Sequence, residues 1–209
     1  MHERSAALDS ALAKLGQPLP GDAAAKLLAY LELLAKWNRI YNLSAIRDPR
    51  RMISHHVLDS LAVRPHLPPG SLADVGSGAG LPGIPLAIAE PSRPVTLIEA
   101  NGKKATFLRQ AIIELKLSNV DVHQGRAESW RPTKSFACVI ARGYADLARL
   151  IADCRHLVRP EGVIAAMKGV LPREELAQVP AGVDCSDVRR LDVPMLDAER
   201  HLILCRCGA

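Results

Sequence analysis

The part of the sequence best suited to chemistry is a glycine-rich stretch that starts at an acidic residue, Asp74-Val75-Gly76-Ser77-Gly78-Ala79-Gly80. It follows a short β-rich run, residues 72–75, and precedes a predicted helix, residues 82–89. Glycines in such a loop let the backbone turn sharply and let a bulky ligand approach without meeting a Cβ. An isolated glycine triplet could also be a flexible surface turn. The strand before it and the helix after it favour a ligand-binding loop.

The spacing of these glycines indicates which nucleoside cofactor the loop accepts. Counted from Gly76, a dinucleotide-binding loop has its third glycine at the position of Leu81, and Pro82 removes an N–H where a pyrophosphate would bind. Glu99 ends the next predicted strand, where a carboxylate can bind two ribose hydroxyls. The pattern G-x-G-x-G, with an acid two residues before it, resembles the motif of class I S-adenosylmethionine-dependent methyltransferases.

Two further loops are expected at the same edge of the sheet, because open α/β sheets bind ligands at the carboxyl ends of their strands. Gly125-Arg126-Ala127-Glu128 follows the third predicted strand, and Arg142-Gly143-Tyr144-Ala145 follows the fourth. Either arginine alone could be a solvated loop charge. Two arginines at the mouth of one crevice favour contact with a ligand or a phosphate.

The elements that position these loops alternate between short strands and helices from residue 72 onward. Strands are expected at residues 72–75, 95–98, 120–122, 136–141, 162–167 and 201–207, and helices at 82–89, 103–117 and 147–158. This alternation predicts right-handed βαβ units. We therefore expect the α/β class and a Rossmann-like, mostly parallel, doubly wound sheet with an antiparallel last strand.

The N-terminal part has a helical pattern instead. Asp22 is a predicted helix N-cap, and the aromatic and leucine positions that follow it lie on one helix face, which indicates a core-facing stripe: Tyr30, Leu34, Trp37 and Tyr41. Asp48-Pro49 predicts the start of another helix, which should run to about Arg64 before Pro65 stops it. We expect a helical extension over residues 1–65 and a cofactor-binding domain over residues 66–209.

Positive charge is concentrated in the N-terminal part. The whole chain carries a net charge of +5, and residues 36–64 hold six basic side chains against two acidic ones. Because aromatic residues make up only 3% of the chain, charge and loop shape are favoured over base stacking for recognition of a nucleic acid. His55 and Asp59, one helical turn apart, favour a surface pair over a metal site, and no metal is expected.

The cysteines point to a reduced, cytoplasmic chain. There are five, an odd number without C-x-x-C spacing, and the N-terminus has no signal-peptide pattern. Cys205 and Cys207 are expected on one strand face as buried thiols. No apolar run approaches the roughly 18 residues of a membrane span, and nothing points to an obligate dimer, so we expect a monomer.

Groups that other methyltransferases use in catalysis are missing. Amino-group enzymes of this class share an acidic or amide residue followed by prolines and an aromatic after the fourth strand, and this chain has Ala141-Arg142-Gly143-Tyr144 there instead. Cys138 lies inside a predicted strand. We therefore expect no catalytic base or nucleophile. An acceptor with an in-plane lone pair, such as N7 of guanine, needs neither, and catalysis then consists of positioning.

Several linked motifs, in order along the chain from about residue 27 to 169, resemble the ribosomal RNA small-subunit methyltransferase G family, also called glucose-inhibited division protein B. The motifs are Lys36 to Leu43, Arg47-Asp48-Pro49, His56 to Ser60, Asp74 to Pro85, Lys103-Lys104 with Phe107-Leu108, Arg126-Ala127-Glu128 and Lys168-Gly169.

The resemblance implies transfer of a methyl group from S-adenosylmethionine to N7 of guanosine 527, in the 530 loop of 16S ribosomal RNA. The RNA is then naked, in the 30S subunit or in an assembly intermediate. Two alternatives stay open: a methyltransferase acting on a protein or small molecule, and a non-catalytic nucleotide-binding or RNA-binding protein.

The resemblance and the fold argument together give candidate site residues. Cofactor contacts are expected from Gly76, Gly78, Leu81, Glu99, Ala127, Glu128 and Arg142. RNA contacts are hypothesised for Arg47, Arg50, Arg51, His55, Lys103, Lys104, Arg126, Tyr144 and Lys168. Gly143 and Tyr144 depart from the family's usual residues after the matching arginine, and Tyr144 either stacks on a base or packs against its own loop.

Overall fold

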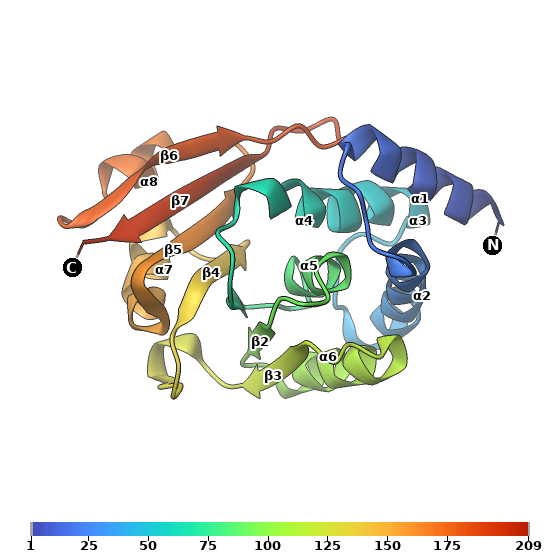
Figure 1. Ribbon diagram of the computed structural model, residues 1–209, viewed down its shortest axis with the longest axis horizontal. Helices are drawn as coiled ribbons and strands as arrows, with labels where there is room; N and C mark the ends of the chain where they lie inside the picture. The colour runs from blue at the N-terminus through green and yellow to red at the C-terminus, as the bar shows by residue number, and fades with distance from the viewer. Residues whose placement is uncertain (1, 209) are drawn as a thin grey trace.

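A mixed sheet forms the centre of the protein, and the computed structural model describes residues 2–208. Its strands are β1 (Leu72–Val75), β2 (Val95–Glu99), β3 (Val120–Gln124), β4 (Phe136–Arg142), β5 (Val158–Lys168), β6 (Val183–Arg190) and β7 (His201–Cys207). They lie in the order β3-β2-β1-β4-β5-β7-β6 (Figure 1). The first five are parallel, and β7 is antiparallel to both neighbours. The predicted fold class is confirmed.

Helices cover both faces of this sheet. They are α1 (His2–Leu15), α2 (Ala23–Tyr41), α3 (Pro49–Met52), the π-helix η1 (Ile53–Leu58), α4 (Asp59–Ala62), η2 (Arg64–His66), α5 (Gly83–Ala89), α6 (Gly102–Leu115), η3 (Ala127–Ser129), α7 (Leu147–Cys154), η4 (Arg155–Leu157) and α8 (Arg173–Ala177). The segment from α3 to η2 is the helix expected from Asp48-Pro49, but it contains a π-helical turn and Pro65 lies inside η2.

Side-chain caps explain where two of these helices begin. Asp48 Oδ1 accepts hydrogen bonds from the backbone N–H groups of Arg50 and Arg51 at 2.8 and 3.2 Å, and Asn101 caps α6 in the same way. Asp22 lies at the N-cap position of α2, as predicted, but its side chain makes no cap hydrogen bond. Its carboxylate lies 3.2 Å from Lys26 Nζ instead.

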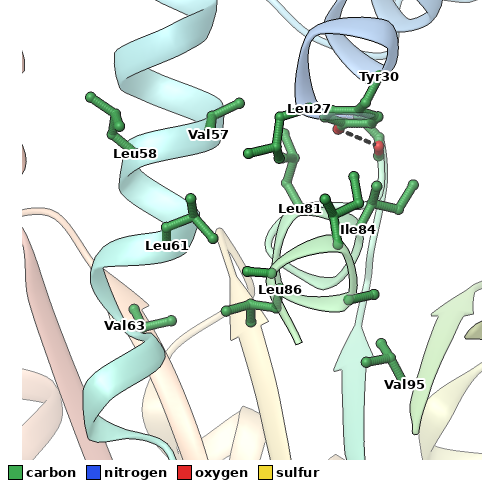
Figure 2. Close-up of a cluster of buried hydrophobic side chains, with 14 of the residues drawn as sticks. Leu27, Tyr30, Val57, Leu58, Leu61, Val63, Leu81, Ile84, Leu86 and Val95 are labelled. Atoms are coloured by element: carbon green, nitrogen blue, oxygen red, sulfur yellow. Dashed lines mark hydrogen bonds between the residues drawn. The ribbon is translucent and has the colours of Figure 1, made fainter. Parts of the chain in front are cut away.

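Alternate residues along the strands face two separate hydrophobic clusters. Leu72 and Leu97 face the N-terminal helices, α5 and α6, whereas Ala73 and Ile98 face α7. Figure 2 shows Leu27 and Tyr30 of α2 packing toward Leu81. The N-terminal helices therefore share a core with the sheet, and α2 packs against the end of the glycine loop.

The predicted aromatic stripe on α2 is only partly buried. Tyr30 and Leu34 are fully buried, and Trp37 is partly buried against the core. The Tyr30 hydroxyl donates a hydrogen bond to the Ala79 carbonyl oxygen at 2.8 Å (Figure 2). Tyr41 is 38% exposed, so its assignment to the core is wrong. It lies at the last residue of the helix, where the packing surface ends.

Residues 170–200 contain two elements that the sequence did not indicate, α8 and β6. Strand β6 is rich in charged residues because it is an edge strand with little buried surface. Strand β5 begins at Val158, earlier than predicted, because its first residues extend the pairing beside β4.

The expectation of five reduced cysteines is wrong for two of them. A register shift between Asp184 and Asp187 in the β6–β7 pair brings Cys185 beside Cys205, and their sulfurs form a disulfide with the Cα atoms 4.1 Å apart. Cys138 and Cys154 are buried thiols, and Cys207 is partly exposed.

Candidate functional site

The glycine loop is fixed to its strand by its own polar groups. The Ser77 hydroxyl donates to the Asp74 carbonyl oxygen at 2.7 Å, and the Gly83 N–H donates to Asp74 Oδ2 at 2.9 Å. The loop turns through positive φ values at Gly76 and Gly78, +68° and +57°, which L side chains rarely adopt. The pattern read from the sequence therefore corresponds to a tight, rigid turn between β1 and α5.

Asp74 is fully buried beneath this loop. Burial raises the pKa of its carboxyl to about 7, against the opposing effects of the Gly83 N–H and the charge of Arg142. Its Oδ1 has no hydrogen-bond partner among the described residues. The carboxyl is therefore poorly solvated when ionised and is close to half protonated near neutral pH.

Glu99 joins the ends of β1 and β2. Its Oε2 accepts a hydrogen bond from the Gly78 N–H and its Oε1 accepts one from the Asn101 N–H, both at 2.8 Å. Each carboxylate oxygen keeps a further lone pair that can accept from a hydroxyl. The side chain is thus held where a ribose diol could bind beside the glycine loop.

A cavity of about 590 Å³ opens at the carboxyl ends of β1, β4 and β5. Its lining includes Gly76, Gly78, Leu81, Arg142, Lys168 and Arg200. His55, His56 and Asp59 reach it from the helical segment that precedes the sheet. The sequence-predicted cofactor residues Gly76, Gly78, Leu81 and Arg142 therefore meet at one cavity, together with the RNA candidates His55 and Lys168.

Other candidates lie along the same edge but outside this cavity. Ala127 is buried in η3, and Glu128 beside it lies 3.5 Å from Arg126 Nη1. Lys103 and Lys104 begin α6 immediately after the Asn101 cap. Arg47 lines a second cavity, of about 470 Å³, between α2 and residues 46–53. Arg50 and Arg51 are exposed on α3.

Arg142 is anchored rather than solvated. Its Nη1 donates to the His55 carbonyl oxygen at 2.8 Å and to Asp59 Oδ2 at 3.0 Å. The π-helical turn η1 immediately precedes Asp59, and π-helical turns in proteins frequently accompany functional sites. The N-terminal helical segment therefore orients a side chain at the end of β4.

The predicted surface pair of His55 and Asp59 is wrong, because Asp59 is only 2% exposed and its carboxylate accepts from arginines. The neighbouring His56 has its Nε2 2.8 Å from the Ser44 hydroxyl. Burial, followed by the charge of Arg142, lowers the pKa of His56 to about 4. Burial also lowers the pKa of His55. Both imidazoles are therefore neutral at pH 7.

Tyr144 and Lys168 are held by partners from the same side of the sheet. The Tyr144 hydroxyl donates to Asp153 Oδ2 at 2.9 Å, and its ring packs against the α7 cluster. Burial raises its pKa. Lys168 Nζ lies 2.7 Å from Glu175 Oε2 and donates to the Ala145 carbonyl oxygen. The geometry favours packing over base stacking for Tyr144.

Sequence reasoning missed Arg200 and the role of Asp59. Arg200 precedes β7, in a stretch to which no function could be assigned, and its Nε donates to Asp59 Oδ1 at 2.8 Å. An isolated arginine in an irregular segment carries no spacing signal. Within the described residues, no cluster of three His, Cys, Asp or Glu side chains is suited to a metal ion. The described helices include none long and apolar enough to span a bilayer.

The residues at this edge of the sheet fit S-adenosylmethionine. Glu99 offers acceptors for a ribose, Gly76 and Gly78 line the cavity, and Arg142 offers a cation for a carboxylate. Asp74 Oδ1 beneath the loop is a buried acceptor without a partner in the described part of the chain.

Comparison with known proteins agrees with this geometry. The family model described as "rRNA small subunit methyltransferase G" matches residues 23–203. The chain is 52% identical to the "Ribosomal RNA small subunit methyltransferase G" of Xanthomonas campestris pv. campestris (strain B100), covering 96% of this chain and 93% of that protein. It is 50% identical to the protein of that name from Methylobacillus flagellatus, covering 94% and 95%.

Solved structures share the fold at low sequence identity. A "DhpI-SAH complex structure" matches with a TM-score of 0.59 at 17% identity, covering 90% of this chain and 98% of that one. A ribosomal protein L11 methylase from Lactobacillus delbrueckii subsp. bulgaricus matches with a TM-score of 0.55 at 14% identity, covering 73% and 77%. These structures show the fold alone. The family model and the relatives at 50–52% identity show that the chain belongs to the rRNA small subunit methyltransferase G family and is an S-adenosylmethionine-dependent methyltransferase.

Proposed function

We propose that this enzyme methylates N7 of a single guanosine, 527, in the 530 loop of 16S ribosomal RNA. The observation that carries the proposal is the cavity beside the glycine loop. It combines the arginines Arg142 and Arg200 with neutral histidines, and the carboxylate that lines it, Asp59, is already bonded to both arginines. Such a cavity can bind an anionic group of a ligand. It also suits a methyl acceptor that does not have to lose a proton before it reacts.

The chemistry then rests on positioning. When bound, S-adenosylmethionine supplies an electrophilic methyl group on a sulfonium. The in-plane lone pair of guanine N7 forms the new N–C bond while the S–C bond breaks and its electrons stay on sulfur. Holding the two reactants in line can contribute on the order of 7–11 kcal/mol. Glu99 and the glycine loop would hold the cofactor, and Arg142 would bind its carboxylate.

The cysteine of β4 is not available as a nucleophile. Cys138 is fully buried in β4, and burial raises the pKa of its thiol to about 12. The guanine must reach the cavity as an accessible or extruded base, because A-form helices hide N7 in a deep, narrow groove.

The remaining RNA contacts proposed here are basic side chains, most of them outside the cavity, together with the neutral His55. Arg47, Arg50 and Arg51 on the helical extension of residues 1–65, with Lys103, Lys104, Arg126, His55 and Lys168, would bind phosphates or base edges along the RNA. Domain 66–209 would carry the cofactor. We place the reaction in the cytoplasm, where the proposed substrate resides, and propose a monomer, since large exposed apolar side chains such as Ile40, Ile113 and Val170 are scattered.

The test uses labelled S-adenosylmethionine with the 30S subunit, a subunit assembly intermediate, naked 16S RNA and total protein as separate substrates, followed by mass spectrometry of nuclease fragments. Label at N7 of guanosine 527 supports the proposal. The RNA substrate that is labelled fastest identifies the form of the RNA on which the enzyme acts. Label in protein, or cofactor binding without transfer, would refute it. Glu99→Gln should weaken cofactor binding, whereas the exposed Glu114→Gln on α6 serves as its matched control.

Charge reversal tests the RNA surface. The double variant Arg50→Glu, Arg51→Glu should weaken 16S RNA binding and flatten its dependence on salt, because each lost phosphate contact removes a counterion-release term. Reversing two exposed arginines of β6, Arg189 and Arg190, is the control of equal charge. Unchanged affinity and salt slope in the first variant would remove α3 from the RNA surface.

A further inference from the structure

Asp59 lies where three segments that are distant in sequence meet. The carboxylate is buried in α4, with 3% of the side chain exposed. Arg142, from the end of β4, donates to its Oδ2 at 3.0 Å, and Arg200, before β7, donates to its Oδ1 at 2.8 Å. One carboxylate thus joins the N-terminal helices to two loops of the sheet, across separations of 83 and 141 residues.

The two guanidinium groups share Asp59 but have different further neighbours around the cavity. Arg142 is oriented by the His55 carbonyl oxygen, and its charge acts on the buried Asp74 beneath the glycine loop. Arg200 Nη1 donates to the Glu199 carbonyl oxygen at 2.8 Å, and a side chain added at Gly169 would lie 4.0 Å from it. Arg142 therefore belongs to the cofactor side of the cavity and Arg200 to the side of β5.

The charges around this carboxylate leave an excess of positive charge. Asp59 balances one of its two arginines, and Lys168 nearby is balanced by Glu175. The hydrogen bonds described for Arg142 use its Nη1, those for Arg200 use its Nε and Nη1, and both side chains line the cavity. Guanidinium groups whose remaining N–H donors face a partly desolvated cavity bind carboxylate or phosphate oxygens with high directionality.

We propose that Asp59 is a positioning residue that holds Arg142 toward the cofactor and Arg200 toward a phosphate of the bound RNA, and so couples the two binding sites. The proposal rests on the proposed function for the identity of the RNA. It assigns to Arg200 a substrate contact, and it explains why a carboxylate is kept buried at a site that binds anions.

The test measures two affinities for each variant: that for S-adenosylmethionine by calorimetry and that for 16S RNA by filter binding. Arg200→Gln should weaken RNA binding about tenfold or more, the usual size of a charge-assisted hydrogen bond, and leave cofactor binding within about twofold. Arg142→Gln should show the opposite pattern. Asp59→Asn should weaken both, and Arg200→Lys should recover part of the RNA affinity.

A double variant separates positioning from simple stabilisation. If Asp59 acts on RNA through Arg200, then adding Arg200→Gln to Asp59→Asn costs little further RNA affinity. If Asp59 only stabilises the fold, the two losses multiply. Should Asp59→Asn fail to fold, the opposite selectivities of Arg200→Gln and Arg142→Gln decide the proposal.

Matched controls exist at the edge of the sheet. Asp187 also contacts two arginines, Arg189 and Arg206, outside the cavity, so Asp187→Asn and Arg206→Gln should leave both affinities unchanged. Equal losses of RNA and cofactor affinity in Arg200→Gln, or RNA binding as tight as in the wild type, would overturn the proposal. If wild-type protein binds 16S RNA but labels another atom, the proposed function fails while these affinity differences still decide the role of Asp59.

Discussion

Two aspartates in this protein each hold two arginines, and they do so in opposite surroundings. Asp59 has 3% of its side chain exposed, and its arginines are 25% and 22% exposed. Asp187 on β6 has 20% of its side chain exposed, and its arginines, Arg189 and Arg206, are about half exposed at 51% and 52%. The charges are the same, and only the setting differs.

The difference in setting decides what each cluster can do. Arg189 lies two residues from Asp187 and Arg206 lies on the paired strand, so the β6–β7 hairpin alone brings them together. The cluster around Asp59 exists only when the N-terminal helices, β4 and the segment before β7 have assembled. A buried carboxylate shared by two cations can orient a binding site, whereas an exposed one is mostly a solvated surface pair.

The largest expected effect is loss of stability in Asp59→Ala. Removing this carboxylate leaves two partly buried guanidinium groups without their anion, and we expect the free energy of unfolding to fall by about 3 kcal/mol. Urea denaturation of wild type and variant, with both arginines intact, measures it. A loss below about 1 kcal/mol would mean that water solvates the two arginines freely in the variant. The stability contributions of Asp59 and Asp187 would then be similar.

The next effect concerns Asp74, a buried carboxyl that accepts no hydrogen bond from a guanidinium in the described part of the chain. Its folded pKa is raised from 3.8 to about 7, so between about pH 4 and pH 7 the unfolded chain is ionised while the folded protein holds the proton. Stability therefore falls as pH rises through this window, by up to about 1.4 kcal/mol per pH unit.

The Asp74→Asn variant removes this titration. The difference in unfolding free energy between it and wild type, measured in urea at pH 5, 6 and 7, should shift in favour of the variant as pH rises. A difference that stays constant with pH would show that Asp74 is ionised in the folded protein throughout. Asp74 would then titrate like a carboxylate that is paired with a cation.

Those features that depend on local sequence could be predicted. The strand–glycine loop–helix unit follows from the spacing of Gly76 and Gly78, and the cap at Asp48 follows from one side chain and the next two N–H groups. The alternation of strands and helices from residue 72 gives the parallel sheet because each unit buries its own apolar face.

Features that depend on distant segments could not. Nothing near Asp59 in the sequence indicates Arg200, 141 residues away, and His55, one helical turn before Asp59, suggested the wrong partner. Strand β6 carries Asp184, Asp187, Arg189 and Arg190 and has little apolar periodicity, because an edge strand gains its stability from pairing with β7. Its disulfide follows from that pairing and not from cysteine spacing.

A smaller effect is expected for Asp187→Ala. Because the cluster is exposed, its removal should lower the unfolding free energy by about 0.5 kcal/mol and leave methyl transfer at the wild-type rate. Urea denaturation and initial rates with the RNA substrate measure both quantities. A stability loss as large as that of Asp59→Ala would show that burial is not what separates the two clusters.

The smallest expected effect is the response of the two clusters to salt. This response tests whether burial causes the difference between them. Double-mutant cycles give the coupling energy of Asp187 with Arg206 and of Asp59 with Arg142.

Raising the ionic strength from about 0.1 to 1 M shortens the screening length from about 10 to 3 Å. The Asp187 coupling, a few tenths of a kcal/mol, should then vanish, because ions reach the space between its partners. The Asp59 coupling should persist, because its carboxylate is buried, with 3% of the side chain exposed. If both couplings fall in proportion, mobile ions reach Asp59 as freely as they reach β6, and burial is not what separates the two clusters.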